Sequence, residues 1–362
     1  MKASSILALV TVLLIVCTSA FAAWEVIYLP PLGSAFSIAN GVSSGRQVGY
    51  AMVGGTPHAG LWSGTAASWV DLNPTGSESR AYGIFGGQQV GYAYRNGGTH
   101  AGLWSDTAAS FIDLNPSGSF YSEAHGISNG QQAGWARIGN YDHATLWSGS
   151  AATWLDLNPV GCTQSRAYGV SGGQQVGGFR VGDYDHAILW SGTASNYIDL
   201  NPSASTFGSY AYGISSGQQV GYAYVDGWVH AGLWSGASES FIDLNPAGRL
   251  HSEALGISNG WQVGLAHFGN YAHASVWKGT SESWVDLHAF LPSDYLYMSS
   301  WAQSIEVTGD DIWIVGSAHN DTLHREEAIL WHGIGVVPEP SSLLVLGTGL
   351  LTLAGIIRKK HG

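Results

Sequence analysis

Six histidines and six aspartates recur at regular spacing, and they are the residues whose chemistry first needs an explanation. Each histidine opens a five-residue segment that ends in tryptophan, successive histidines lie 42 to 44 residues apart, and an aspartate follows each tryptophan by nine residues. A histidine beside a carboxylate can bind a metal ion or transfer a proton. The repeated sets are His58, Trp62 and Asp71; His100, Trp104 and Asp113; His143, Trp147 and Asp156; His186, Trp190 and Asp199; His230, Trp234 and Asp243; and His273, Trp277 and Asp286.

The sixfold repetition favours a structural role for these residues. A His and a Trp four apart on one strand point to the same face, and the Asp falls on the neighbouring strand, within reach of the imidazole or the indole N–H. We therefore predict a packing network in which a buried Trp with a paired N–H and a carboxylate-held His stabilise each repeat. Six catalytic or metal sites are the alternative. With one His in each repeat, the histidines lie too far apart to bind a single zinc ion together. Calcium binding at the acidic loops remains an alternative, although no segment has EF-hand spacing.

Short strands are the elements that must position these residues. In the fifth repeat the strand-like segments are 211–214, 219–224, 230–234 and 240–244, separated by Gly- and Ser-rich turn signals. Four strands in about 43 residues are typical of a β-propeller blade. Helical repeats are excluded because the units have no 3.6-residue apolar period and the chain has 51 Gly.

A seventh, degenerate unit follows the six. Residues 302–307, 311–317 and 327–331 correspond to three strands, with Glu327 in place of the His, and residues 26–31 resemble the missing fourth strand. We predict an all-β, seven-bladed propeller whose last blade is closed by the N-terminal strand, which removes open sheet edges. The expected blades are 35–76, 77–118, 119–161, 162–204, 205–248, 249–298 and 299–336, with the closing strand at 24–33. Blades appear to have been copied in blocks of three, since 122–130 returns at 252–260.

Charge and cysteine content exclude several classes of protein. Only 10% of residues are charged, and between the terminal segments 9 basic residues face 24 acidic ones. Nucleic acid is not an expected partner, because a phosphate-binding surface needs clustered Lys and Arg. Cys17 falls in the leader and Cys162 has no mate, so the mature chain has no internal disulfide.

Both ends of the chain have the features of targeting segments. Lys2, an apolar run at 6–16 and Ala20-Phe21-Ala22 form a secretory signal peptide at 1–22, for which we predict cleavage by signal peptidase after Ala22. An uncleaved membrane anchor is the alternative. Val16 is too bulky to precede a lipid-modified Cys17.

The C-terminal segment 337–362 has three parts: Val337-Pro338-Glu339-Pro340, an apolar run at 343–357, and Arg358-Lys359-Lys360. The basic cluster favours a cytoplasmic end. This tail resembles the PEP-CTERM sorting signal of Gram-negative bacteria that make exopolysaccharide. The resemblance implies a transmembrane helix that holds the precursor transiently in the inner membrane until exosortase, a membrane protease-transpeptidase, removes the tail. A plain single-pass anchor is the alternative.

The repeats also resemble known repeat families. The segments that begin with His-Ala are similar to the extracellular HAF repeats, named for a His-Ala-Phe core, although Gly, Thr, Ile or Ser replaces the Phe here. WD-repeat propellers use a similar network of His, Trp and Asp.

No catalytic signature is present in the sequence. The G-x-S-x-G pattern occurs only at one repeated turn, at 41–45, 126–130, 169–173, 213–217 and 256–260, where a strand and not the helix of a nucleophile elbow is expected to follow, and the sequence has no phosphate-binding loop. We interpret Arg80 and Arg166, at equivalent places in two repeats, as products of duplication, and Cys162 as incidental. We therefore expect no enzymatic activity, no cofactor and no bound metal; a propeller-fold glycosidase or lyase and a protein-interaction scaffold are the alternatives.

The turns fall into two kinds. Those after the first and third strands of each unit are nearly uniform, whereas those after the second and fourth vary and carry aromatic residues. Aromatic faces beside hydrogen-bonding groups suit sugar rings. We predict that the protein is a structural or binding component of the cell envelope or extracellular polysaccharide matrix, and that these turns bind glycans weakly and multivalently. The alternative is that the turns vary only because nothing constrains their sequence. The candidate binding residues are Tyr141, Tyr184, Trp228 and Tyr271; the variable turns between blades include Phe120, Tyr121, Phe207, Leu250 and His251.

Overall fold

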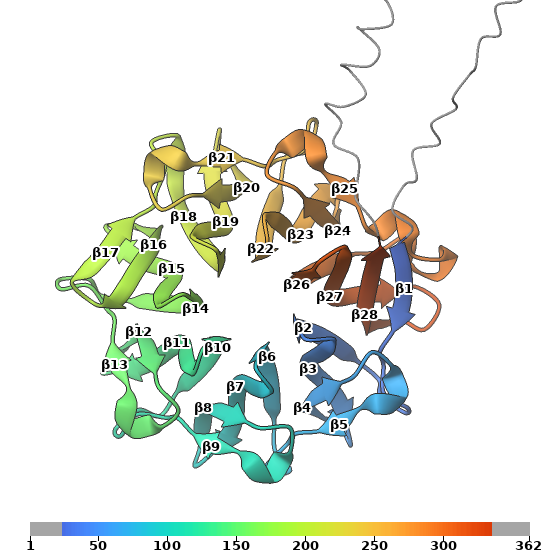
Figure 1. Ribbon diagram of the computed structural model, residues 1–362, viewed down its shortest axis with the longest axis horizontal. Helices are drawn as coiled ribbons and strands as arrows, with labels where there is room; N and C mark the ends of the chain where they lie inside the picture. The colour runs from blue at the N-terminus through green and yellow to red at the C-terminus, as the bar shows by residue number, and fades with distance from the viewer. Residues whose placement is uncertain (1–23, 335–362) are drawn as a thin grey trace, which may run out of the picture. The chain divides into compact units, whose positions relative to one another are not determined.

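The computed structural model describes residues 24–334, which form seven four-stranded antiparallel sheets set radially around a central axis (Figure 1). The innermost strands are β2 (Ser37–Ser43), β6 (Ser79–Phe85), β10 (Ser122–Ser128), β14 (Ser165–Ser171), β18 (Ser205–Ser215), β22 (Ser252–Ser258) and β26 (Ser300–Thr308). The second strands are β3 (Arg46–Val53), β7 (Gln88–Arg95), β11 (Gln131–Ile138), β15 (Gln174–Val181), β19 (Gln218–Val225), β23 (Trp261–Phe268) and β27 (Asp311–Asn320).

The outer half of each blade holds the repeated residues. The third strands are β4 (Thr56–Trp62), β8 (Gly98–Trp104), β12 (Tyr141–Trp147), β16 (Tyr184–Thr193), β20 (Trp228–Trp234), β24 (Tyr271–Trp277) and β28 (Arg325–Ile334). The fourth strands are β5 (Val70–Asp71), β9 (Ile112–Asp113), β13 (Leu155–Asp156), β17 (Asn196–Asp199), β21 (Ile242–Asp243), β25 (Val285–Asp286) and, in the last blade, β1 (Trp24–Tyr28).

The predicted closure by the N-terminal strand is confirmed. Strand β1 pairs antiparallel with β28, from Trp24 opposite Gly333 to Tyr28 opposite Ile329. The Leu29 N–H then donates to the Ala328 carbonyl at 2.9 Å, and the Leu29 side chain is fully buried. Pairing the two ends of the chain in one blade covers the edge of β28 and gives the last sheet the same four strands as the other six.

The fourth strands are shorter than the sequence predicts. In the fifth blade, the expected strand 240–244 is a two-residue strand, β21, preceded by the 3₁₀ turn η4 (Ser238–Ser240). The Ser240 hydroxyl accepts from the Ser235 N–H at 2.8 Å and donates to the Ala237 carbonyl. Such local side-chain bonds compete with strand pairing. Similar turns are η1 (Ala66–Ser68), η2 (Ala108–Ser110), η3 (Ala151–Thr153) and η5 (Ser281–Ser283), while η6 (His288–Phe290) and η7 (Ser293–Tyr295) connect the last two blades.

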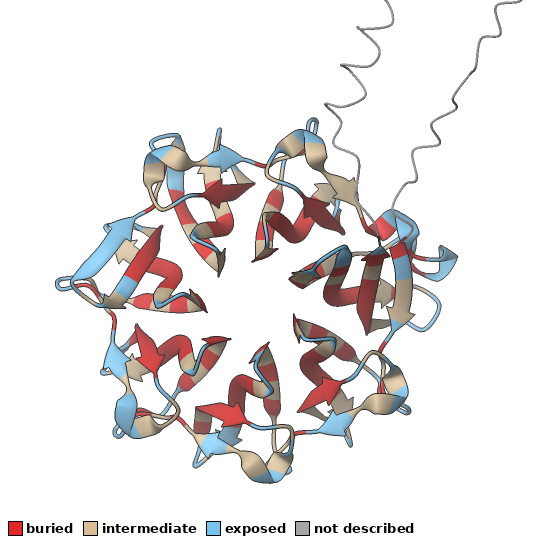
Figure 2. Ribbon diagram, viewed as in Figure 1, coloured by how far each residue is buried: buried red, intermediate tan, exposed pale blue. Residues whose placement is uncertain are grey.

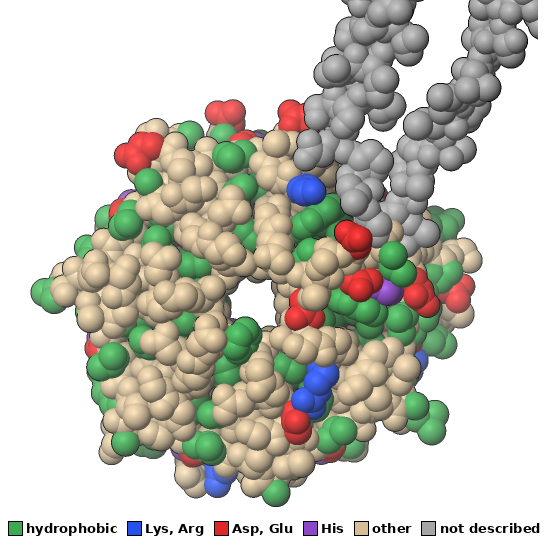
Figure 3. Space-filling model, viewed as in Figure 1, with side chains coloured by type: hydrophobic (Ala, Val, Ile, Leu, Met, Phe, Trp, Pro, Cys, Tyr) green, Lys and Arg blue, Asp and Glu red, His purple; other side chains and the backbone are tan. Residues whose placement is uncertain are grey.

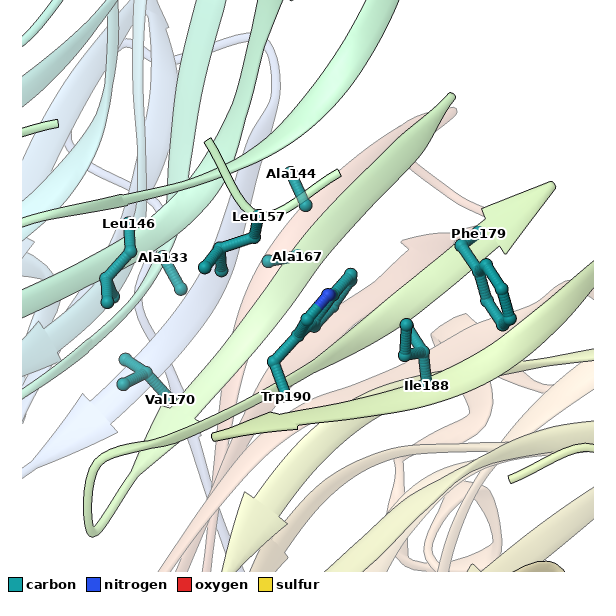
Figure 4. Close-up of a cluster of buried hydrophobic side chains, with 9 residues drawn as sticks. All are labelled: Ala133, Ala144, Leu146, Leu157, Ala167, Val170, Phe179, Ile188 and Trp190. Atoms are coloured by element: carbon teal, nitrogen blue, oxygen red, sulfur yellow. The ribbon is translucent and has the colours of Figure 1, made fainter. Parts of the chain in front are cut away.

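The repeated tryptophans pack between blades. Figure 2 shows burial concentrated on the inner three strands, with exposed residues at the outer strands and turns. Trp190 of the fourth blade, fully buried, lies with Leu146 and Leu157 of the third blade (Figure 4). Trp62 likewise packs with Leu330 of the last blade. The tryptophans therefore stabilise the contact with the preceding blade in addition to their own blade, in which Trp62, for example, packs on Trp69 at 4.6 Å between ring centroids.

The expected pairing of the indole N–H is found once. Trp104 donates to the Leu72 carbonyl of the preceding blade at 2.8 Å. Among residues 24–334 the indole N–H groups of the other five repeated tryptophans have no hydrogen-bond partner, so the expectation is wrong for them. The apolar contact area of these rings, not their N–H group, makes them useful between blades.

Both targeting segments predicted from the sequence, 1–22 and 337–362, lie outside the described residues. Over residues 24–334, no helix combines the length and the apolar character needed to cross a bilayer.

Candidate functional site

The repeated His and Asp side chains form one hydrogen bond in each of the first six blades. Imidazole Nδ1 lies 2.7 to 3.0 Å from carboxylate Oδ2 in every pair. The other oxygen, Oδ1, accepts the backbone N–H two residues further on at 2.8 to 3.0 Å, as Asp113 does from Asn115. Both carboxylate oxygens thus have protein partners, which suits a structural pair better than a metal ligand or a general base.

A serine that the sequence analysis did not single out extends this network between blades. The Ser122 hydroxyl, at the start of the third blade, accepts from the Ala101 N–H of the second blade at 3.0 Å and donates to Asn115 Oδ1 at 2.6 Å. The Ala-to-Ser bond recurs at all seven interfaces, at 2.9 to 3.0 Å. The signal was present in the sequence, because the first strand of every unit contains Ser-x-Ala.

A buried glutamine explains why one set of turns is uniform. Gln89 is fully buried; its amide donates to the Gly87 carbonyl at 3.0 Å and accepts from the Asp106 N–H at 2.9 Å. It therefore ties the turn after the first strand to the turn after the third. Glutamines in the other repeated blades do the same: Gln47, Gln132, Gln175, Gln219 and Gln262.

The four candidate glycan-binding aromatics lie on the opposite, variable ends of four successive blades. Tyr141, Tyr184, Trp228 and Tyr271 each begin the third strand of their blade. Their exposures are 51%, 45%, 49% and 42%, so each ring is available to a ligand. No two of the four form an aromatic pair with each other in the described structure. They are separate contact points rather than one site.

Tyr184 borders a cavity with other aromatic residues. This groove of about 190 Å³ lies between the fourth and fifth blades. The Tyr184 and Phe207 ring centroids are 5.7 Å apart, and those of Phe207 and Tyr224 are 5.9 Å apart. Strand β18 extends back to Ser205, which carries Phe207 to the groove with 48% of its surface exposed. We call this the blade 4–5 groove; its lining is completed by Arg180, Asp183, Asp185, Ser209, Tyr210 and Tyr222.

The polar residues of the blade 4–5 groove can both donate and accept hydrogen bonds. Arg180 Nε lies 3.1 Å from Asp185 Oδ1, and the Arg180 guanidinium also donates to the Asp183 carbonyl at 2.6 Å. Burial raises the pKa of Tyr210 and of Tyr222, so both hydroxyls remain protonated donors at neutral pH. Aromatic faces beside a balanced set of donors and acceptors match the two surfaces of a sugar ring.

Arg80 and Arg166 are each occupied by their own partners. Arg80 lies 3.0 Å from Glu78 and 4.5 Å above the Tyr50 ring. Arg166 bonds to Asp142, which also accepts from Arg137 at 2.6 Å. Burial alone would raise the pKa of Asp142, but the hydrogen bonds from these two arginines hold it below its ordinary value.

Within residues 24–334, no group of side chains is arranged for metal binding or for thiol chemistry. That region holds no group of three or more His, Cys, Asp or Glu side chains placed to bind one ion. Cys162 is half-buried and unpaired, and burial raises the pKa of its thiol, which keeps it in the less reactive protonated form.

Solved structures resemble this fold at low sequence identity. An acylaminoacyl peptidase from Pyrococcus horikoshii aligns with a TM-score of 0.52 and 11% identity, over 87% of this chain and 54% of that one. TolB from Acinetobacter baumannii aligns with a TM-score of 0.46 and 8% identity, over 67% of this chain and 63% of that one. The β-propeller domain of the Trilobed protease from Pyrococcus furiosus aligns with a TM-score of 0.49 and 9% identity, over 84% of this chain and 100% of that one. The chain thus spans less than two thirds of the first two structures, and the likeness shows the fold alone.

A comparison with curated proteins finds no match to this sequence. The HAF repeat type stays a prediction.

The tail does match a family: residues 336–359 are a PEP-CTERM protein-sorting motif, which implies export of the chain, a membrane-anchored precursor and processing by exosortase.

Proposed function

We propose that this exported propeller is a non-enzymatic, glycan-binding component of the cell surface or of the extracellular polysaccharide matrix. Its principal binding site in this proposal is the blade 4–5 groove. The observation that carries the proposal is the convergence of exposed Tyr184 and Phe207 with Tyr224 beside the Arg180–Asp185 ion pair.

Several features of this groove support carbohydrate as the ligand. Tyr184 and Phe207 stand edge to face, at an interplanar angle of 70°, so a ligand lying against the pair meets two differently oriented aromatic surfaces. Binding residues on turns held by a rigid scaffold keep their geometry without an ordering cost. The remaining single aromatics, Tyr141, Trp228 and Tyr271, add weak contacts on neighbouring blades, and several weak contacts to one long polymer give avidity.

The test compares retention on the host's exopolysaccharide by affinity electrophoresis, with the full-length chain in a detergent that has no sugar headgroup. The double variant Tyr184→Ala with Phe207→Ala should bind about tenfold or more weakly, since aromatic contacts are worth about 0.5–1.5 kcal/mol each. Phe85→Ala is the matched control, because Phe85 is 40% exposed but ends strand β6, next to the turn at the other end of its blade.

The proposal is contradicted if the double variant, with its melting temperature intact, is retained as strongly as the wild type. The enzymatic alternative is tested on the same samples by measuring new reducing ends or unsaturated products in the polysaccharide. Release of such products by the wild type would make the chain a glycosidase or lyase instead.

A further inference from the structure

Every blade interrupts the pairing of its first two strands at the same place. In the first blade Ala39 pairs with Gly49 and Gly41 with Val48, which leaves Asn40 unpaired in a β-bulge. A bulge re-aims the side chain that it carries. The seven bulged residues together line a cavity of about 300 Å³ at the propeller axis, and they are Asn40, Tyr82, His125, Tyr168, Tyr212, Leu255 and Gln303. Figure 3 shows the axial channel open to view.

The scaffold around the bulge is constant, although the bulged residue is not. The preceding residue is a fully buried Ala in all seven blades, and the following residue is Gly in six. That Gly is needed for close approach between blades: a Cβ on Gly83 would lie 2.6 Å from the His125 carbonyl oxygen. A position used only for packing would repeat, as the tryptophans do. Five residue types at one bulge indicate that the channel lining is not set by the repeat itself.

Aromatic rings form one wall of the channel. Tyr82 and His125 stack at 4.5 Å with an interplanar angle of 8°. His125 and Tyr168 meet edge to face at 5.1 Å, and Tyr168 and Tyr212 do so at 5.4 Å. The opposite wall, from the sixth, seventh and first blades, consists of Leu255 and the amides of Gln303 and Asn40.

Two of the charged side chains next to the channel are paired with an opposite charge, and two carboxylates lie beside a histidine. Two residues before the bulge, four blades carry Arg80, Glu123, Arg166 or Glu253. Their partners are Glu78 at 3.0 Å, His125 at 3.2 Å, Asp142, and His251 at 3.1 Å respectively. No bulged residue is a Lys, Arg, Asp or Glu. The channel lining therefore offers aromatic faces, hydroxyls and amides, and it includes no Lys or Arg that would attract an anion.

We propose that the axial channel binds one or two uncharged sugar rings, such as the end of a neutral glycan chain. The cavity lies at the lower end of the roughly 300–1,000 Å³ usual for small-molecule sites, which suits a monosaccharide or disaccharide. The aromatic wall supplies the apolar face, and the Gln303 amide supplies hydrogen bonds to hydroxyl groups. Asn40 adds its Oδ1 as an acceptor, since its amide nitrogen already donates to the Ala81 carbonyl at 2.8 Å. This site is separate from the blade 4–5 groove and does not depend on it.

The test is saturation-transfer NMR on the full-length chain, in a detergent without a sugar headgroup, with five probes: methyl β-glucoside, methyl β-galactoside, cellobiose, maltose and glucuronic acid. We expect at least one neutral probe to bind and glucuronic acid not to bind. Leu255→Trp, which fills the channel, should reduce the neutral signal at least fivefold. The matched control is Leu250→Trp, at a 59% exposed loop position between blades, which should leave the signal unchanged.

A second variant covers the case in which Leu255→Trp fails to fold. Gln303→Leu keeps the size of the side chain but removes the amide, and it should weaken binding of the same probe about fivefold. The Tyr184→Ala, Phe207→Ala variant should keep the full channel signal, which separates this site from the groove. The inference is overturned if no neutral probe binds or if neither channel variant weakens binding. It is also overturned if glucuronic acid binds to the wild type and Leu255→Trp abolishes that binding.

Discussion

Ser37 in the first blade and Ala328 in the last, 291 residues apart, form the bond that closes the ring: the Ala328 N–H donates to the Ser37 hydroxyl at 3.0 Å. The same bond joins every other pair of neighbouring blades, for example Ala101 and Ser122. The closing interface therefore uses the contact that the repeat provides, although its two halves come from opposite ends of the sequence.

Ser37→Ala should destabilise the propeller. It leaves the buried Ala328 N–H without an acceptor, which costs about 1–3 kcal/mol of unfolding free energy. Urea unfolding followed by tryptophan fluorescence measures the change. Ser43→Ala, at the half-buried end of the same strand, is the control and should change stability by less than about 0.5 kcal/mol. Equal stability of the two variants would mean that this bond contributes nothing to closure.

Deletion of residues 24–33 should destabilise the whole ring. The deletion removes β1 and the fully buried Leu29, and it leaves β28 as an open edge. We expect the melting temperature to fall by on the order of 10 °C, measured by circular dichroism. An unchanged melting temperature would show that the last blade does not need the N-terminal strand.

Stability should fall as the pH drops below about 6.5, in part because of His288. Burial is the main cause that lowers the pKa of His288 below 6.5, and nearby His273, stacked on it at 4.1 Å, adds to the effect while Asp286 and Asp321 oppose it. The unfolded chain then binds the proton at a higher pH than the native state does, so acid favours unfolding. Urea titrations at pH 7.5 and pH 5.5 measure the loss.

His288→Asn is the matched variant for this pH effect. The other five repeats have Asn at this position, and in the fourth interface Asn201 Oδ1 accepts from Ser209 at 2.8 Å, much as His288 Nδ1 lies 2.8 Å from Ser300. We expect the variant to fold and to lose less stability than the wild type between the two pH values. Identical losses would assign the acid sensitivity elsewhere, for example to His267, whose pKa burial also lowers.

Replacement of Pro338, Glu339 and Pro340 with alanine should block processing of the tail. The matched motif covers these residues, and exosortase is the enzyme that the motif implies. We expect an unprocessed precursor in the inner membrane of the native host, detected by an antibody to the last residues together with cell fractionation. An intact C-terminus on the mature wild-type protein would contradict the prediction.

Much of this fold is predictable because its repeat is regular. The 42- to 44-residue spacing of the histidines predicts the blades, and the likeness of residues 26–31 to a fourth strand predicts the closure at β28. The fixed distance from His100 to Asp113 predicts that they lie on neighbouring strands, where they are 2.8 Å apart. Each of these relations is local or repeated, so the sequence alone determines it.

Relations between blades were decided only by the tertiary structure. Alternation along β16 shows that Trp190 faces a sheet surface, but not that the surface belongs to the preceding blade. The bulge at Tyr82 depends on Gly83 lying against the His125 carbonyl of the next blade, and the blade 4–5 groove depends on Phe207 reaching Tyr184 from the extended β18. The sequence spacing of the residues in these contacts does not indicate that they meet. The alternation of side chains along a strand specifies which face of the sheet a residue occupies, but only tertiary packing specifies what lies against that face.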